Sequence, residues 1–136
     1  MIKREKEIAA FEGLLGRHPV VGIIGLEGHP KVGASWEGFV IRQIVARLDA
    51  FPEECFFWST HAGAELDLLV VRGKRRLGFE IKRTSSPKVT RSMHSALKDL
   101  KLGQLFVIHA DTHSFFLTET IRAISFARLL EDLEPL

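Results

Sequence analysis

The sequence contains a single cysteine and no long apolar run. Cys55 alone allows no internal disulfide and no metal site built from several cysteines. Such low cysteine usage is the default of a reducing compartment. No apolar stretch approaches the roughly 18 residues of a membrane-spanning helix, and residues 1–15 lack the apolar core of a signal peptide. These absences predict a cytoplasmic protein with no membrane partner.

The sequence also lacks a phosphate-binding loop for a nucleoside triphosphate. The glycines of residues 28–33 (GHPKVG) have the wrong spacing for such a loop, and no Gly-Lys-Ser/Thr follows them. We therefore expect no ATP site in this chain.

The composition is that of an ordinary globular domain. With 46% hydrophobic and 26% charged residues, the 136-residue chain can bury a core without disulfides or structural metals. We expect one main domain over residues 35–136, with residues 1–34 forming an N-terminal helix and loop packed on its core.

Apolar periodicity predicts an α/β fold. Helices are expected over about residues 3–16, 35–50, 89–100 and 119–132, and strands over about residues 56–61, 65–72, 75–83, 105–109 and 115–117. Residues 17–34 contain several glycines and two prolines, which predicts a loop with a short apolar insertion. No internal repeat or domain linker is evident.

Basic residues are concentrated in the middle of the chain. From Arg72 to Lys101 there are ten lysines or arginines and only two acids, whereas Asp111 to Leu136 holds five acids and two arginines. A basic segment of this kind occurs on nucleic-acid-binding surfaces, but a solvated face is the more common explanation. Charge alone leaves both interpretations open.

The two strands expected at residues 65–72 and 75–83 are joined by a tight turn. Gly73 can adopt the positive φ that such a turn requires, so we expect Arg72 to pair with Arg75. A hairpin with this register places every pair of facing residues on a common face of the sheet.

This register brings charged residues together inside apolar strands. Asp67 stands directly across from Glu80, and Lys82 leaves its strand on the same face two residues later. Like charges directly opposite one another destabilise a strand pair, so a divalent cation between the carboxylates is the simplest explanation. The structural alternative is a buried ion pair between Glu65 and Lys82, beside a partly protonated Asp67. Spacing alone leaves these two interpretations about evenly balanced.

The opposite face of the hairpin is predicted to be apolar. It is expected to carry Leu66, Leu68, Val70, Leu77, Phe79 and Ile81. Both faces are then largely buried, as in the centre of an α/β sheet.

Glu37 adds a third acid from a helix. Ser35 is a good N-cap, and Glu37 lies four residues before Ile41 on the apolar stripe of the helix that follows. A first-turn acid is also favoured by the helix dipole alone. Its place on the inward stripe nevertheless directs Glu37 towards the body of the protein.

The combination of Asp67, Glu80-Ile81-Lys82 and Glu37 resembles the PD-(D/E)XK nuclease superfamily. Its signature is an acid on one strand, Glu-x-Lys on the next, and a glutamate on a preceding helix. Leu66 stands where the proline of that name would be. The resemblance implies catalytic roles for Glu37, Asp67, Glu80 and Lys82, with Mg²⁺ or Mn²⁺ held by the three acids.

Longer segments are similar to the domain of unknown function found at the C-terminus of many prokaryotic AAA-type ATPases. The similar segments, within about Leu14 to Leu136, are HPKVGASWEGFVIRQIV, FFWSTHAGAELDLLVV, LGFEIKRTSSPKVTRSMHSALKDL and ARLLEDLEPL. This resemblance implies a restriction-endonuclease-like αβββαβ core, with a central mixed sheet flanked by helices, over residues 35–136.

Three basic residues flank the candidate site. Arg83, Lys88 and Arg91 are the best candidates for contacting a nucleic-acid backbone. DNA is therefore one expected partner; an ATPase domain or another protein is the alternative, and a homodimer is left open.

Three functional hypotheses follow from these residues. The first is a Mg²⁺-dependent nuclease acting on DNA, and the second is a non-catalytic module of an ATPase system that binds nucleic acid or protein. The third is an inactive remnant with a stable fold. The basic bias of residues 72–101 weakly favours the first two.

Overall fold

The computed structural model of the protein describes residues 20–25 and 35–136. The helix expected over residues 3–16 and the glycine-rich segment 28–33 lie outside these described residues. The same holds for most of the N-terminal unit expected over residues 1–34.

The described elements follow the predicted order through the centre of the chain. They are β1 (Val20–Gly25), α2 (Trp36–Leu48), a 3-10 turn (Pro52–Glu54), β2 (Cys55–Thr60), β3 (Glu65–Arg72), β4 (Arg75–Ile81), α3 (Arg91–Asp99), β5 (Gln104–His109), β6 (Phe115–Phe116), β7 (Ile121–Ser125), a second 3-10 turn (Phe126–Arg128) and α4 (Leu129–Asp132). From α2 to β5 this is the αβββαβ succession predicted from the sequence.

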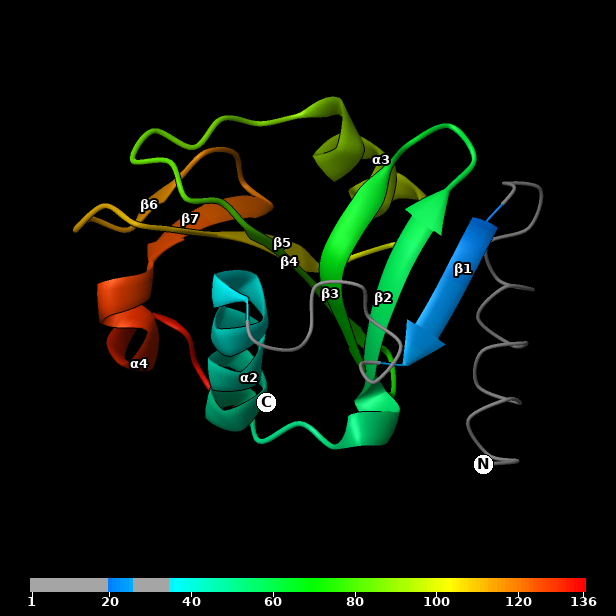
Figure 1. Ribbon diagram of the computed structural model, residues 1–136, viewed down its shortest axis with the longest axis horizontal. Coiled ribbons are helices and arrows are strands. Elements are labelled where there is room, and N and C mark those ends of the chain that lie inside the picture. The colour runs from blue at the N-terminus through cyan, green and yellow to red at the C-terminus, as the bar shows by residue number, and fades with distance from the viewer. Residues whose placement is uncertain (1–19, 26–34) are drawn as a thin grey trace.

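The strands of the described residues form one mixed sheet (Figure 1). Its order is β1-β2-β3-β4-β5-β7-β6. Strands β1 to β4 are antiparallel, β4, β5 and β7 run parallel, and β6 is antiparallel to β7. The expected mixed sheet flanked by helices is thereby confirmed.

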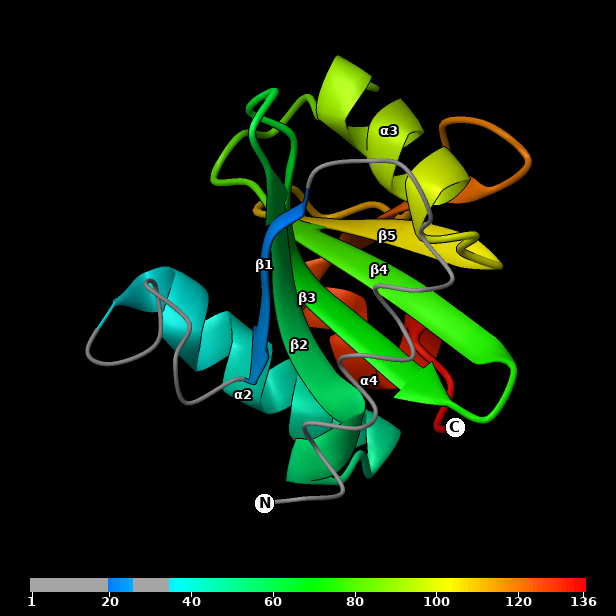
Figure 2. The same cartoon turned by 90° about the vertical axis from the view of Figure 1, so that its right-hand side faces the viewer.

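Helices cover both faces of this sheet. Figure 2 shows α2 and α3 on opposite sides of the strands. One apolar cluster joins α2 to residues such as Leu68 and Phe79, and a second contains Met93 and Ala96 of α3 together with Trp58. Each fully buried large apolar side chain contributes about 1.5–3 kcal/mol through removal from water. None of the described helices is long and apolar enough to cross a membrane.

Strand β1 corrects the loop expected over residues 17–34. Its six residues pair antiparallel with β2, with a register shift between Val20 and Gly22. The two glycines of this stretch suggested a loop, but its valines and isoleucines suit a pleated strand once β2 supplies a partner.

Strand β7 corrects the first half of the helix expected over residues 119–132. Ile121 and Ile124 are spaced three residues apart, which fits one face of a helix, but both are fully buried in a strand beside β5. A strand covered on both faces shows no alternating pattern, so its short apolar run resembles that of a helix. Only residues 129–132, at the end of the expected segment, form an α-helix.

The hairpin register is confirmed, and Gly73 has a φ of 59°. Arg72 pairs with Arg75, and the ladder continues to the pair Leu68 and Phe79. The positive φ explains why glycine is suited to this turn.

A β-bulge in β3 places Leu66 on the face of the sheet opposite to the predicted one. On β2, Trp58 pairs with Leu66, but Phe56 pairs with Leu69, so β3 carries one extra residue at Asp67 and Leu68. Leu66 consequently packs in the cluster under α3, whereas Leu68 packs under α2. The prediction that Leu66 and Leu68 share a face is wrong because sequence spacing does not reveal the bulge.

Candidate functional site

Asp67 and Glu80 form the centre of the candidate site. The backbone N–H of Asp67 donates to Oε1 of Glu80 at 3.2 Å, and the backbone N–H of Ile81 donates to Oδ2 of Asp67 at 2.9 Å. Each carboxylate therefore bonds to the backbone of the opposite strand, just beyond the last ladder pair. The side chains replace ladder hydrogen bonds at the point where two acids face one another.

Both carboxylates of this pair are buried. Asp67 is 1% exposed and Glu80 is 7% exposed. Two buried acids of like charge cost free energy unless protein dipoles, cations or protons compensate them. The bulge at Asp67 contributes to their placement, because bulges re-aim side chains and are over-represented next to active sites.

Lys82 supplies a positive charge beside this pair. Its Nζ lies 3.7 Å from Oε2 of Glu80, and 44% of its side chain is exposed. Its backbone N–H donates to the carbonyl of Ile108 at 2.8 Å, which holds this position against β5. Glu65 is exposed, so the alternative of a buried ion pair between Glu65 and Lys82 is wrong.

Glu37 lies at the N-terminus of α2, as predicted. Ser35 caps this helix by accepting a hydrogen bond from the backbone N–H of Gly38 at 3.1 Å. Oε1 of Glu37 lies 3.8 Å from Nε of Arg83, whose guanidinium also stacks over Trp36 at 5.2 Å. Glu37 is thus paired with Arg83, the residue that follows Lys82.

The structure brings three of the four predicted catalytic residues into direct contact. Glu80 contacts both the backbone N–H of Asp67 and the ammonium of Lys82, whereas Glu37 pairs with Arg83. Within residues 35–136, no three histidine, cysteine, aspartate or glutamate side chains are grouped as a metal site. The metal set of three acids remains a prediction.

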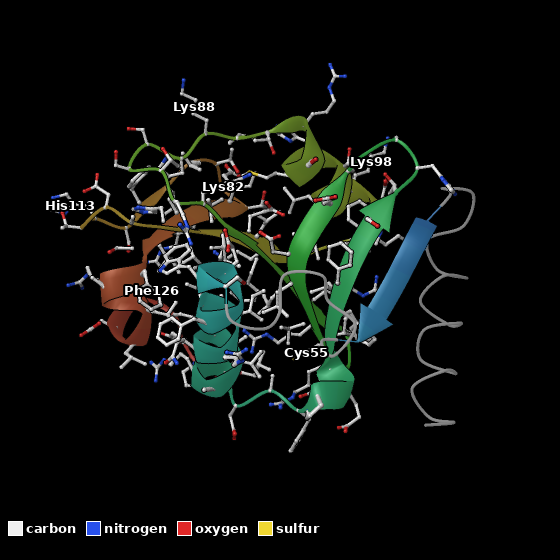
Figure 3. All side chains as sticks on the ribbon, in the orientation of Figure 1. Cys55, Lys82, Lys88, Lys98, His113 and Phe126 are labelled. Atoms are coloured by element: carbon white, nitrogen blue, oxygen red, sulfur yellow. The ribbon has the colours of Figure 1, made fainter. Side chains whose placement is uncertain are left out.

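The predicted nucleic-acid contacts lie on and beside the loop between β4 and α3. Arg83, Lys88 and Arg91 are all exposed. Figure 3 shows Lys88 projecting from this loop into solvent. Thr84 stabilises the loop by accepting a hydrogen bond from the backbone N–H of Ser86 at 3.1 Å. These exposed positions permit contact with a large ligand.

Sequence reasoning missed a second buried polar pair, His109 and Ser125. The two residues end β5 and β7, pair across these strands and are both fully buried. His109 Nδ1 accepts a hydrogen bond from the backbone N–H of Asp111, while His109 Nε2 and Ser125 Oγ have no partner among the described residues. The available signal was a polar residue directly after an isoleucine, Ile108 or Ile124, at the end of each strand. Both lie at the carboxyl ends of parallel strands, where α/β sheets place their sites.

His109 predicts a pH dependence of stability. Burial lowers the pKa of its imidazole below 6.5, against smaller opposing effects from the Asp111 carboxylate and a backbone hydrogen bond of His113. The unfolded chain therefore binds more protons than the folded one just below pH 6.5, so the free energy of unfolding falls as the pH drops, down to the folded-state pKa. Urea unfolding at about pH 7.5 and about pH 5.5 measures this loss. His109→Gln should reduce the difference, whereas His61→Gln, at an exposed turn, should retain it; equal losses in all three proteins would contradict the assignment.

The comparisons with known proteins assign the chain to a family without an assigned function. Residues 32–129 match the domain of unknown function DUF4143. Uncharacterized proteins of Mycobacterium bovis and Mycobacterium tuberculosis are each 46% identical to this chain over 121 residues. The match covers 87% of this chain but only 26% of each relative, so the chain spans about a quarter of their length. No solved structure matches significantly. Because the family match covers most of the chain, this protein belongs to the DUF4143 family.

Proposed function

We propose that this domain is a PD-(D/E)XK-type nuclease domain that binds Mg²⁺ or Mn²⁺ and hydrolyses phosphodiester bonds of DNA. The observation that carries the proposal is the contact between the buried acids Asp67 and Glu80, with Lys82 beside them. A fold has no structural need for two like charges at facing positions of its central strands. A divalent cation bound between the two carboxylates would compensate their repulsion.

The donor chemistry of this pair fits a hard cation. Mg²⁺ binds carboxylate oxygens and keeps several waters, so one or two protein carboxylates are an ordinary set. The carboxylates of Asp67 and Glu80 offer oxygen donors of the kind that Mg²⁺ prefers. Asp67 and Glu80 would hold the cation, which would polarise the phosphate and activate a water when bound.

Lys82 has a separate role in the proposed reaction. Hydrolysis forms a bond from a water oxygen to phosphorus and breaks the bond from phosphorus to the leaving sugar oxygen, which takes up a proton. The partly exposed ammonium of Lys82, 3.7 Å from Glu80, can donate a hydrogen bond to a phosphate oxygen or to the attacking water. The positive charge of Lys82 is needed beside the site because the buried anionic pair alone would repel a phosphate.

We place Glu37 and Arg83 at the mouth of the proposed site, because Arg83 directly follows Lys82 and pairs with Glu37. Glu37 would add a further carboxylate for the cation if Arg83 contacts a phosphate instead. Arg83 is 66% exposed at its side chain, so its 3.8 Å contact with Glu37 is weak and can be exchanged. Lys88, beyond it on the loop, would contact the backbone further out.

A second candidate function is a non-catalytic binding module of an AAA-type ATPase system. The observation that favours it is that no three potential ligand side chains are grouped among residues 35–136. Such a module would bind nucleic acid with strong salt dependence, or bind a protein, without turnover.

Nicking of supercoiled plasmid DNA tests the proposal. Wild-type protein should nick the plasmid with Mg²⁺ or Mn²⁺ and not with a chelator, and both Asp67→Asn and Lys82→Ala should lose this activity. Glu65→Ala, an exposed acid on the same strand as Asp67, serves as the matched control and should cleave normally. Circular dichroism of each variant shows that it is folded. Retained nicking in the two site variants would overturn the assignment of these residues, and metal-independent DNA binding without nicking would favour the second function.

A further inference from the structure

A groove lies between α3 and the turn that joins β2 to β3. It has a volume of about 380 Å³. The wall from the turn is made of small residues, Thr60, Ala62 and Ala64. Two hydrogen bonds join Thr60 and Ala64: Thr60 N–H donates to the Ala64 carbonyl at 2.9 Å, and Ala64 N–H donates to Thr60 Oγ1 at 3.2 Å. The turn is therefore a defined wall, and its small side chains leave the groove open.

The wall from α3 is basic. Arg91, His94 and Lys98 line the groove at the spacing that places side chains on one face of a helix. Met93 and Ala96, on the other face, are buried against the sheet, so the basic face is fixed towards the groove and solvent. Thr90 caps this helix by accepting a hydrogen bond from the backbone N–H of Met93 at 3.3 Å.

One wall of the groove continues along the chain into β3, which carries Asp67. Ala64 of the groove wall precedes Asp67 by three residues of extended chain, or about 10 Å at 3.3 Å per residue. Measured along the axis of duplex DNA, this distance spans about three phosphates of one strand. Figures 1 and 2 both place α3 beside the β2–β3 turn, and Figure 3 shows Lys98 on the α3 side and Lys82 and Lys88 further to the left, all in the upper half of the view.

We propose that this groove binds the sugar–phosphate backbone of the DNA strand that occupies the Asp67–Glu80 site. The inference rests on the proposed function, because it names the path of that function's substrate. Arg91 and Lys98 supply the charge, and the hydroxyl of Ser95, which also lines the groove, can donate to a phosphate oxygen. Asp99 lines the groove beyond Lys98, so two phosphates are expected in the groove, one at Arg91 and one at Lys98.

Nucleic acid fits this groove better than an acidic protein segment. A phosphate backbone presents charge at regular short intervals, which matches basic residues repeated on successive helical turns. The turn wall consists of one threonine and two alanines, and it lacks the large apolar side chains that line pockets for peptide anchor residues. A DNA strand bound at the proposed Asp67–Glu80 site must also extend beyond that site, and the groove offers it a basic surface.

Binding of a fluorescent duplex oligonucleotide, measured in a chelator so that cleavage does not intervene, tests this path. The variant Arg91→Ala/Lys98→Ala is compared with Lys74→Ala/Arg75→Ala, which removes two exposed basic residues from the β3–β4 turn at the other end of the hairpin. Losing two phosphate contacts should reduce the slope of log affinity against log salt by about 2 and weaken binding about tenfold or more at low salt. The control variant should bind like wild type.

The outcomes separate this inference from the proposed function. Selective loss in the groove variant supports the path even if no nicking is ever observed, in which case only the nuclease assignment fails. Equal behaviour of the groove and control variants, or no DNA binding by wild type, overturns the path. The path is also overturned if poly-glutamate displaces the duplex at a comparable concentration of charge and if its binding depends on Arg91 and Lys98.

Discussion

Replacing Glu80 by glutamine should abolish metal-dependent cleavage and at the same time stabilise the metal-free protein. The amide oxygen can still accept the hydrogen bond from the backbone N–H of Asp67, so the hairpin keeps its geometry. One of two buried like charges is removed, which should raise the free energy of unfolding in a chelator by about 1 kcal/mol or more. The lost contact with half-exposed Lys82 offsets less than this, since such pairs contribute about 0–1 kcal/mol.

The same substitution should reduce nicking by at least about a hundredfold, because it removes a carboxylate from the proposed cation site. Urea unfolding and plasmid nicking are measured on the same preparations. Glu65→Gln, at an exposed position of β3, is the matched control and should change unfolding by no more than about 0.5 kcal/mol. A destabilised Glu80→Gln protein with full nicking would mean that Glu80 is a structural acid.

The second large effect concerns the core that supports the hairpin. Phe79→Ala should lower the free energy of unfolding by about 3–5 kcal/mol, the usual cost of emptying a large buried aromatic position. Phe79 is fully buried next to Glu80 and stacks on Phe106, with ring centroids 5.1 Å apart and an interplanar angle of 21°. Denaturant unfolding measures the loss, and Leu130→Ala, at a 67% exposed position, should change it by no more than about 0.5 kcal/mol. Similar losses in the two variants would show that α2 and β4 do not form the main core.

The sequence predicted the hairpin well because its constraints are local. Gly73 determines the turn, the turn determines the register, and the register brings Asp67 to Glu80. The N-cap at Ser35 was predictable for the same reason, since the cap and its N–H donor are three residues apart.

What the sequence did not reveal depends on contacts between distant segments. The bulge that separates Leu66 from Leu68 exists only relative to β2. Strand β7 was mistaken for a helix because four of its five residues are buried, which removes the alternation of a half-exposed strand. The pairing of His109 with Ser125 follows from that same strand and was missed with it.

Calorimetric titration of Mg²⁺ or Mn²⁺ into wild-type protein and Asp67→Asn tests the central claim most directly. The asparagine side chain of this variant would keep an oxygen that can accept the backbone hydrogen bond of Ile81, so the substitution changes charge more than structure. A saturable heat of binding is expected for the wild type and none for the variant, because the cation is proposed to bind between Asp67 and Glu80. Matching titrations of the two proteins would contradict the metal site and, with it, the proposed nuclease.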